Sequence, residues 1–117
     1  DDADIAAIRA AGLRFGISTH DKTELRRALA LAPDYIALGP IYPTILKKMK
    51  WHEQGVAKLA TWRGLIGDTP LIAIGGMSID RAAGAFDAGA DVVAAVTDIT
   101  LNADPEERVS AWLKATR

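Results

Sequence analysis

Short apolar runs alternate along the chain with stretches in which apolar residues recur at helical spacing. Four of these runs have the length of a strand and show no clean alternation with polar residues. They span residues 13–18, 35–41, 71–75 and 92–97. Such runs are typical of strands that are covered on both faces. Because helical patterns such as Val56, Leu59 and Ala60 separate them, the sequence predicts an α/β fold with parallel strands and right-handed crossovers.

Capping signals mark the expected starts of three helices. Asp21 precedes Glu24 by three residues, Ser78 directly precedes an apolar residue, and Asp104 is followed by a proline. Such side chains accept hydrogen bonds from the backbone N–H groups of a first helical turn, and proline is tolerated there because it lacks that donor. We interpret these residues as structural caps.

The first expected element is a helix over residues 4–10, which no strand precedes. Four strand–helix units are half of a (β/α)8 TIM barrel, which takes eight units and about 250 residues. Half a barrel leaves both edges of its parallel sheet unpaired, and such edges favour association. We therefore expect residues 1–117 to be one partial domain, the last four βα units of a barrel, completed by an N-terminal half of the same barrel. Self-association of two copies and an open four-stranded sandwich are the alternatives.

Composition restricts the expected partners. The chain has 14 Lys and Arg residues against 15 Asp and Glu residues, a formal net charge of -1, so neither nucleic acid nor a membrane surface is expected as a partner. No apolar run approaches the roughly 20 residues of a membrane span. Cysteine is absent, which excludes disulfides and thiolate chemistry within the chain and is consistent with a reducing compartment. The expected localisation is therefore cytoplasmic.

Candidate ligand-binding residues stand where the expected strands end, because parallel α/β folds bind ligands at the carboxyl ends of their strands. Gly75-Gly76 lies between a strand and a helix, so its backbone N–H groups are candidates for holding a phosphate, although tight turns also use glycine for conformation alone. In the last half of a barrel, Gly75-Gly76 and Val96-Thr97 would end the seventh and eighth strands, where phosphate sites recur. Both pairs are predicted to bind a phosphorylated small-molecule substrate.

The end of the first strand and a basic stretch supply further candidates. Ser18 and Thr19 end the first strand, where each could bind a ligand or form a cap or turn hydrogen bond. Lys47 lies in a basic stretch beyond the second strand, where its ammonium would offset negative charge on a departing phosphate, whereas the neighbouring lysines are expected to be solvated. Neither of the two histidines has the partner pattern of a triad or a metal site, so no metal ligand is predicted within the chain.

Four segments, spread over nearly the whole chain, together resemble thiamin-phosphate synthase. They are GISTH at residues 16–20, YIALGPIYPT at 35–44, IAIGG at 72–76, and GAD at 89–91 leading into Val96-Thr97. The LGPIYPT stretch is the most specific of them, because the Gly-Gly turn and the GAD motif occur in many phosphate-binding barrels. The resemblance implies a transferase that joins hydroxymethylpyrimidine diphosphate to thiazole phosphate and releases diphosphate with the help of Mg²⁺.

The resemblance also implies roles for individual residues. Lys47 and Ser18 would be catalytic and would hold the leaving diphosphate as negative charge builds on it. Thr44, Gly76 and the Val96-Thr97 pair would bind the thiazole phosphate, largely through backbone amides. The ligands of Mg²⁺ would belong to the N-terminal half of the barrel, so the isolated segment is expected to be inactive.

Two departures from the family pattern leave alternatives open. The family usually continues the Pro-Thr motif with a polar residue, Thr and then Lys, whereas here Ile45-Leu46 precedes Lys47, and Leu46 cannot donate a side-chain hydrogen bond. Pro40 stands where the related thiazole tautomerases typically carry histidine, which argues against tautomerase chemistry. A thiazole tautomerase-like enzyme and a non-catalytic phosphate-binding or regulatory relative are the alternative functions.

Overall fold

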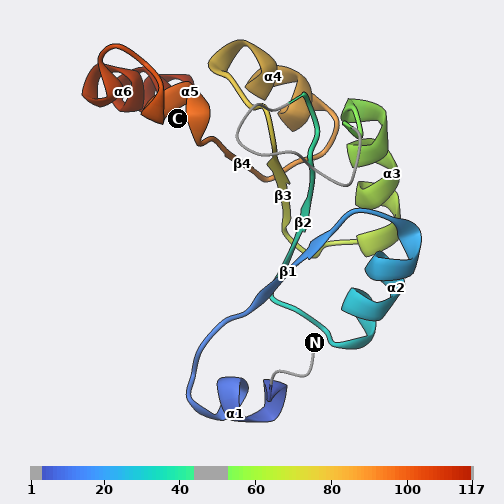
Figure 1. Ribbon diagram of the computed structural model, residues 1–117. Helices are drawn as coiled ribbons and strands as arrows, with labels where there is room; N and C mark the ends of the chain where they lie inside the picture. The colour runs from blue at the N-terminus through green and yellow to red at the C-terminus, as the bar shows by residue number, and fades with distance from the viewer. Residues whose placement is uncertain (1–3, 44–52, 117) are drawn as a thin grey trace.

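The structure, a computed structural model, describes residues 4–43 and 53–116 as four strands and six helices (Figure 1). In chain order the elements are α1 (Ile5–Ala10), β1 (Gly16–Thr19), α2 (Lys22–Ala30), β2 (Tyr35–Leu38), α3 (Val56–Ile66), β3 (Leu71–Ile74), α4 (Ile79–Asp87), β4 (Val92–Ala94), α5 (Thr97–Thr100) and α6 (Pro105–Ala115). The strands form one sheet in the order β1-β2-β3-β4, and all three pairings are parallel. The predicted α/β class with four parallel strands is confirmed.

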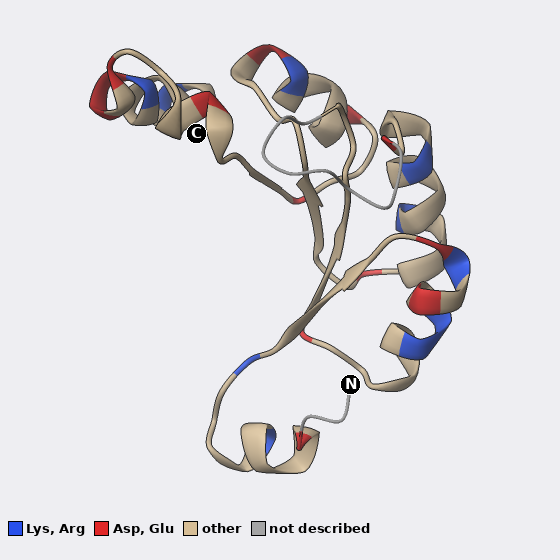
Figure 2. Cartoon of the chain, in the orientation of Figure 1, with Lys and Arg blue, Asp and Glu red and all other residues tan. Residues whose placement is uncertain are grey.

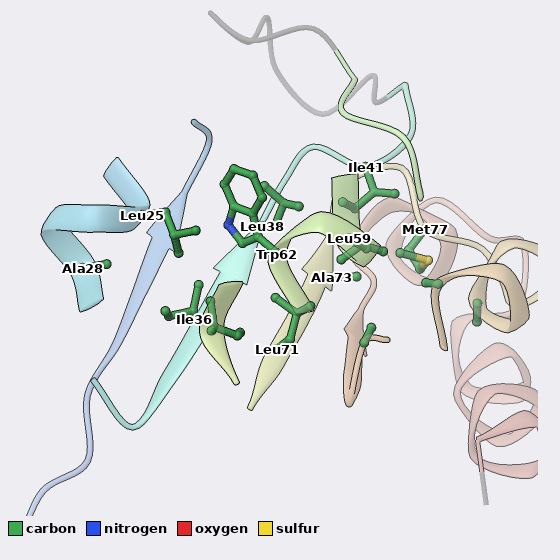
Figure 3. Close-up of a cluster of buried hydrophobic side chains, with 14 of the residues drawn as sticks. Leu25, Ala28, Ile36, Leu38, Ile41, Leu59, Trp62, Leu71, Ala73 and Met77 are labelled. Carbon is green, nitrogen blue, oxygen red and sulfur yellow. The ribbon is translucent and has the colours of Figure 1, made fainter. Parts of the chain in front are cut away.

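The hydrophobic core lies between one face of the sheet and the helices α2, α3 and α4. Figure 3 shows side chains from the strands meeting side chains from these helices. Ile36, Leu38, Leu71 and Ala73 point to this face from β2 and β3, and each is fully buried. Trp62 of α3 is the largest side chain that is fully buried among the described residues. The strands themselves carry no charged residue, and Figure 2 shows the charges on the helices and connections.

The opposite face of the sheet exposes apolar side chains. Ala37, Ile72 and Val92 are register partners, so their side chains share this face, as do those of Tyr35 and Ile74 two residues away along their strands. Val92 is 47% exposed, and Tyr35 and Ile74 are each 38% exposed. The expectation that the strands are covered on both faces is therefore wrong for the described residues. We call this surface the open face.

The helix starts follow the predicted caps. The carboxylate of Asp21 accepts a hydrogen bond from Glu24 N–H at 2.8 Å, and that of Asp104 accepts one from Glu107 N–H at 3.1 Å. Ser78 Oγ accepts from the N–H of Arg81 at 3.4 Å. As expected, Asp21 and Ser78 cap the helices that follow β1 and β3, and Asp104 caps α6.

Three strand boundaries differ from the sequence prediction by three residues, and one of them is the end of the second strand, which lies at Leu38 rather than at residue 41. The first strand begins at Gly16 rather than at residue 13, because Leu13 lies on the connection from α1 and is 62% exposed. The fourth strand ends at Ala94, and Thr97 begins the short helix α5 instead of ending the strand. None of the helices among the described residues is both long and apolar enough to cross a bilayer.

Candidate functional site

The carboxyl ends of β2 and β3 continue into two turns that are paired with each other. Ile41 N–H donates to Ile74 O at 3.0 Å, and Tyr42 N–H donates to Gly75 O at 3.1 Å. The β2–β3 ladder therefore extends past the last strand residues into the LGPIYPT stretch. This extension brings two of the sequence motifs singled out above side by side at one end of the sheet.

Glycine is required at both positions of the Gly75-Gly76 turn. Their φ angles of 105° and 61° lie in the left-handed region that favours glycine. A Cβ on Gly75 would lie 2.5 Å from Pro40 Cα, and a Cβ on Gly76 would collide with the carbonyl oxygen of Pro43. Conformation and close packing are thus sufficient reasons for both glycines. The same packing holds the turn directly against the loop that leads to Thr44.

The other predicted phosphate-binding pair leaves the sheet at the same end. Ile74 is the register partner of Ala94, so Gly75 and the chain beyond Ala94 follow neighbouring parallel strands. Val96 is the N-cap residue of α5 and is 41% exposed, and Thr97 is the first residue of that helix. The structure therefore places Gly75-Gly76 and Val96-Thr97 on adjacent strand ends, as predicted for a shared phosphate site.

The carboxylate of Asp98 anchors α5 to α6. It accepts hydrogen bonds from Arg108 Nε at 2.9 Å, Arg108 Nη2 at 3.1 Å and Trp112 Nε1 at 2.7 Å. The hydrogen bond from Arg108 lowers the pKa of Asp98 most; partial burial opposes it, and Trp112 lowers the pKa further. Asp98 raises the pKa of Arg108 in turn, with a smaller electrostatic contribution from Asp80 in the first turn of α4. The helices that follow β3 and β4 therefore both act on one guanidinium.

Ser18 and Thr19 lie next to each other in β1 but face opposite sides of the sheet. Ser18 is exposed and shares the open face with its register partner Ala37. Thr19 is fully buried: its Oγ1 donates to Ala37 O at 2.8 Å and accepts from Trp62 Nε1 at 2.8 Å. The hydroxyl of Thr19 thus joins β1, β2 and α3, so a substrate contact by this residue would have to come from its backbone.

Gln54 connects the ends of β1 and β2 where the chain returns to α3. Its backbone N–H donates to Pro40 O at 2.6 Å, and its side-chain Nε2 donates to His20 O at 2.9 Å. His20 is held in turn by Glu24, whose Oε1 lies 2.8 Å from His20 Nδ1 and accepts from the His20 backbone N–H at 2.7 Å. These contacts give His20 and Gln54 a structural part in shaping this end of the sheet.

Two of the predicted site residues, Thr44 and Lys47, lie outside the described residues, as does Leu46. Among the residues that the structure does describe, no three His, Asp or Glu side chains come together in a way that could hold a metal ion. The sequence reasoning did not single out Gln54 or Arg81 at this end of the sheet. Gln54 contacts His20 and Arg81 contacts Tyr42, and no local motif marks contacts between residues so distant in the chain.

The match to a known family agrees with the motifs and with their placement. A family model described as thiamine monophosphate synthase matches residues 1–99. The chain belongs to the thiamine monophosphate synthase family. The resemblance inferred from the four sequence segments is therefore confirmed. The matched range includes all four strands and the turns at their carboxyl ends, and it ends within α5.

Named members of the thiamine monophosphate synthase family align with most of the chain. The thiamine-phosphate synthase of Rhizobium etli is 60% identical over 114 residues, covering 97% of this chain and 56% of that protein. The thiamine-phosphate synthase of Serratia proteamaculans is 51% identical over 100 residues, covering 86% of this chain and 47% of that protein. The chain thus spans about half the length of the curated relatives that it matches.

A solved structure supports the fold independently. Thiamine phosphate pyrophosphorylase from Pyrococcus furiosus superposes on this chain with a TM-score of 0.81 at 23% sequence identity, covering 99% of this chain and 55% of that one. At this level of identity the likeness shows the fold alone. It shows that the four parallel strands and their helices are arranged here as in about half of that larger protein.

Proposed function

We propose that this chain supplies the carboxyl-end substrate site of a thiamine-phosphate synthase, a transferase that joins hydroxymethylpyrimidine diphosphate to thiazole phosphate and releases diphosphate. Family membership and the 60% identity to the Rhizobium etli enzyme support this proposal. The observation that carries it is the placement of the LGPIYPT stretch, the Gly75-Gly76 turn and Val96-Thr97 at one end of adjacent strands. The chain spans about half of its relatives, so we expect activity only when the other half of the fold is present.

In this proposal the thiazole phosphate is held mainly by backbone amides. Gly76 and Val96-Thr97 follow neighbouring strand ends, so their amides would contribute to one site for a phosphoryl group. Thr44 would join them from the loop that is packed against the Gly-Gly turn. Amide donors of this kind suit a phosphate that is bound but not cleaved, because they fix its position and add no titrating group.

A different set of residues would bind the leaving diphosphate. Ser18 is exposed on the open face, one strand away from the LGPIYPT stretch, and can donate a hydroxyl hydrogen bond there. The ammonium of Lys47 would stabilise the charge that builds on diphosphate as the carbon–oxygen bond breaks. Mg²⁺ would neutralise part of the same charge, with ligands from outside this chain. Among residues 4–43 and 53–116, no three His, Asp or Glu side chains come together as a metal site.

The competing functions are distinguished by turnover. A thiazole tautomerase is not favoured, since the similar relatives are named thiamine-phosphate synthase and Pro40 replaces the histidine typical of tautomerases. A non-catalytic phosphate-binding relative would keep the amide site and lose the release of diphosphate. Leu46 is the residue in this sequence that favours that second reading, since it cannot donate a hydrogen bond to a leaving group.

The test is a chimera in which these 117 residues replace the stretch that they match in the Rhizobium etli enzyme. We expect the chimera to release diphosphate from the two precursors and to form thiamin phosphate. Lys47→Ala should slow diphosphate release by about 100-fold or more, because it removes charge stabilisation of the transition state. The same variant should change the affinity for thiazole phosphate by only a few-fold. A chimera that binds thiazole phosphate but never releases diphosphate would instead identify a binding module.

A further inference from the structure

Arg81, in the first turn of α4, contacts both of the turns that meet at the carboxyl ends of β2 and β3. Its Nη1 donates to Gly76 O at 2.6 Å. Its guanidinium carbon lies 4.8 Å from the centre of the Tyr42 ring, and the Tyr42 hydroxyl donates to the backbone carbonyl of Arg81 at 3.3 Å. One exposed side chain thus bridges the Gly-Gly turn and the LGPIYPT stretch.

These contacts bear on the direction of the backbone amides. In a trans peptide the N–H and the C=O point in opposite directions, so fixing the carbonyl fixes the amide. Gly75 O is held by Tyr42 N–H, which sets the peptide plane that carries the Gly76 N–H. Gly76 O is held by Arg81, which sets the next plane, the one that carries the Met77 N–H. The two successive amides of the turn are therefore oriented by two different partners.

The contact from Arg81 depends more strongly on the type of residue than the contact from Tyr42 does. Tyr42 holds Gly75 through its backbone, so any residue at position 42 except proline could make that bond. The bond to Gly76 O depends on an arginine side chain, whose planar guanidinium both donates to the carbonyl and stacks on the ring. Lysine has the same charge but lacks the planar fork, so it would not reproduce both contacts.

We propose that Arg81 is a positioning residue of the phosphate site, which orients the Gly76–Met77 peptide by holding Gly76 O while stacked on Tyr42. The proposal rests on the proposed function, because the ligand of this turn is taken to be the thiazole phosphate. Arg81 bonds the carbonyl side of that peptide, and the amide points the opposite way. Its effect on the phosphate is therefore indirect, through the backbone.

The experiment compares Arg81→Ala and Arg81→Lys in the chimera by steady-state kinetics with thiazole phosphate as the varied substrate. We expect Arg81→Ala to raise KM for thiazole phosphate about tenfold and to leave kcat within about twofold, because the loss falls on binding of the unreacting phosphate. Arg81→Lys should behave like Arg81→Ala. Restoration of KM by lysine would overturn the proposal in favour of a direct charge contact with the phosphate.

Arg63→Ala is the matched control. Arg63 also holds backbone carbonyls next to a glycine turn, with Nη1 3.2 Å from Gly89 O, but it does so at the amino end of the sheet. This variant should lower stability and leave KM for thiazole phosphate unchanged. If Arg81→Ala still forms product with an unchanged KM, the proposed role of Arg81 is rejected and the proposed function stands. An unmodified chimera that forms no thiamin phosphate would reject the proposed function and this inference together.

Discussion

The two ends of the sheet are built on different principles. At the amino end, Asp34 and Asp91 stand before β2 and β4 and make the same pair of bonds to the neighbouring strand. Asp34 N–H donates to Phe15 O at 2.8 Å and its carboxylate accepts from Phe15 N–H at 2.8 Å. Asp91 makes this exchange with Leu71, at 2.8 Å and 2.9 Å. The two aspartates that directly precede β2 and β4 therefore make the same hydrogen-bonding arrangement.

At the carboxyl end, backbone hydrogen bonds join the turns that follow β2 and β3, and glycine lets these turns pack closely. Gly75 and Gly76 leave room for the loop after β2, and Gln54 and Arg81 donate from the side to carbonyl groups. At the amino end, Asp34 and Asp91 occupy the N–H groups of Phe15 and Leu71. At the carboxyl end, Arg81 occupies the carbonyl group of Gly76. With Gly76 O occupied by Arg81, an anionic substrate at the Gly-Gly turn would meet amide donors rather than that carbonyl group, which suits the proposed function.

Among the substitutions that test this comparison, Gly76→Ala is expected to change stability most. An alanine Cβ would collide with Pro43 O and would be strained at a φ of 61°, so we expect a loss of about 3–5 kcal/mol or failure of the chimera to fold. Urea unfolding measures the loss. Gly64→Ala is the matched control, because no atom lies within 4 Å of its added Cβ, and we expect it to stabilise α3 by about 0.5–1 kcal/mol. Equal stability of the two variants would contradict the packing argument.

A second contrast lies within β1, between Thr19 and Ser18. Thr19→Val leaves Trp62 Nε1 and Ala37 O buried without their partner, which should cost about 2–3 kcal/mol in the free energy of unfolding. Ser18→Ala should change stability by less than about 0.5 kcal/mol, because Ser18 is exposed, but should slow diphosphate release. Unfolding and product release measured on both variants test the two roles. Thr19→Ser, which keeps the hydroxyl, should recover most of the stability lost in Thr19→Val.

The sequence predicts those features of the fold that are marked locally. The caps at Asp21, Ser78 and Asp104 and the order of apolar runs predict the helix starts and the parallel sheet. The start of β1 was misplaced because Leu13 is apolar but lies outside the sheet, exposed on the connection from α1. The helix α5 was missed because four residues carry too little periodicity to separate a helix turn from a strand end.

The candidate site likewise contains features that the sequence marks locally and features that it does not. Glycine pairs after a strand are visible in the sequence, so the Gly75-Gly76 turn could be predicted. Arg81, which holds that turn against Tyr42, and Gln54, which joins the ends of β1 and β2, are ordinary polar residues whose contacts with distant elements no local motif marks. Thr19 shows the reverse case: the alternation of the strand turns its hydroxyl into the core, so the predicted ligand contact stays a prediction for its backbone alone.

The smallest expected effect is the pH dependence of the stability that Asp98 contributes at the carboxyl end and Asp91 at the amino end. Arg108 lowers the pKa of Asp98 most, and the backbone of Leu71 lowers that of Asp91 most, from an ordinary value of 3.8. A depressed pKa means that each carboxylate stabilises the fold above about pH 3.8 and loses this contribution as pH falls through the folded-state value. We expect Asp98→Asn to cost about 1–2 kcal/mol at pH 7 and Asp91→Asn to cost less, because the Asp91 side chain is 52% exposed.

Urea unfolding of the chimera and of both variants at pH 7, pH 5 and pH 3 measures these contributions. Below pH 3.8 the difference between each variant and the parent should shrink, because the unfolded parent binds a proton there that the folded carboxylate, with its lowered pKa, binds only at lower pH. Because Asp98 holds α5, whose first residue is Thr97, its variant should also weaken thiazole phosphate binding at pH 7. Asp91→Asn should not weaken that binding, because Asp91 acts at the amino end. Equal weakening of binding by the two variants would mean that the carboxyl end responds only to overall stability.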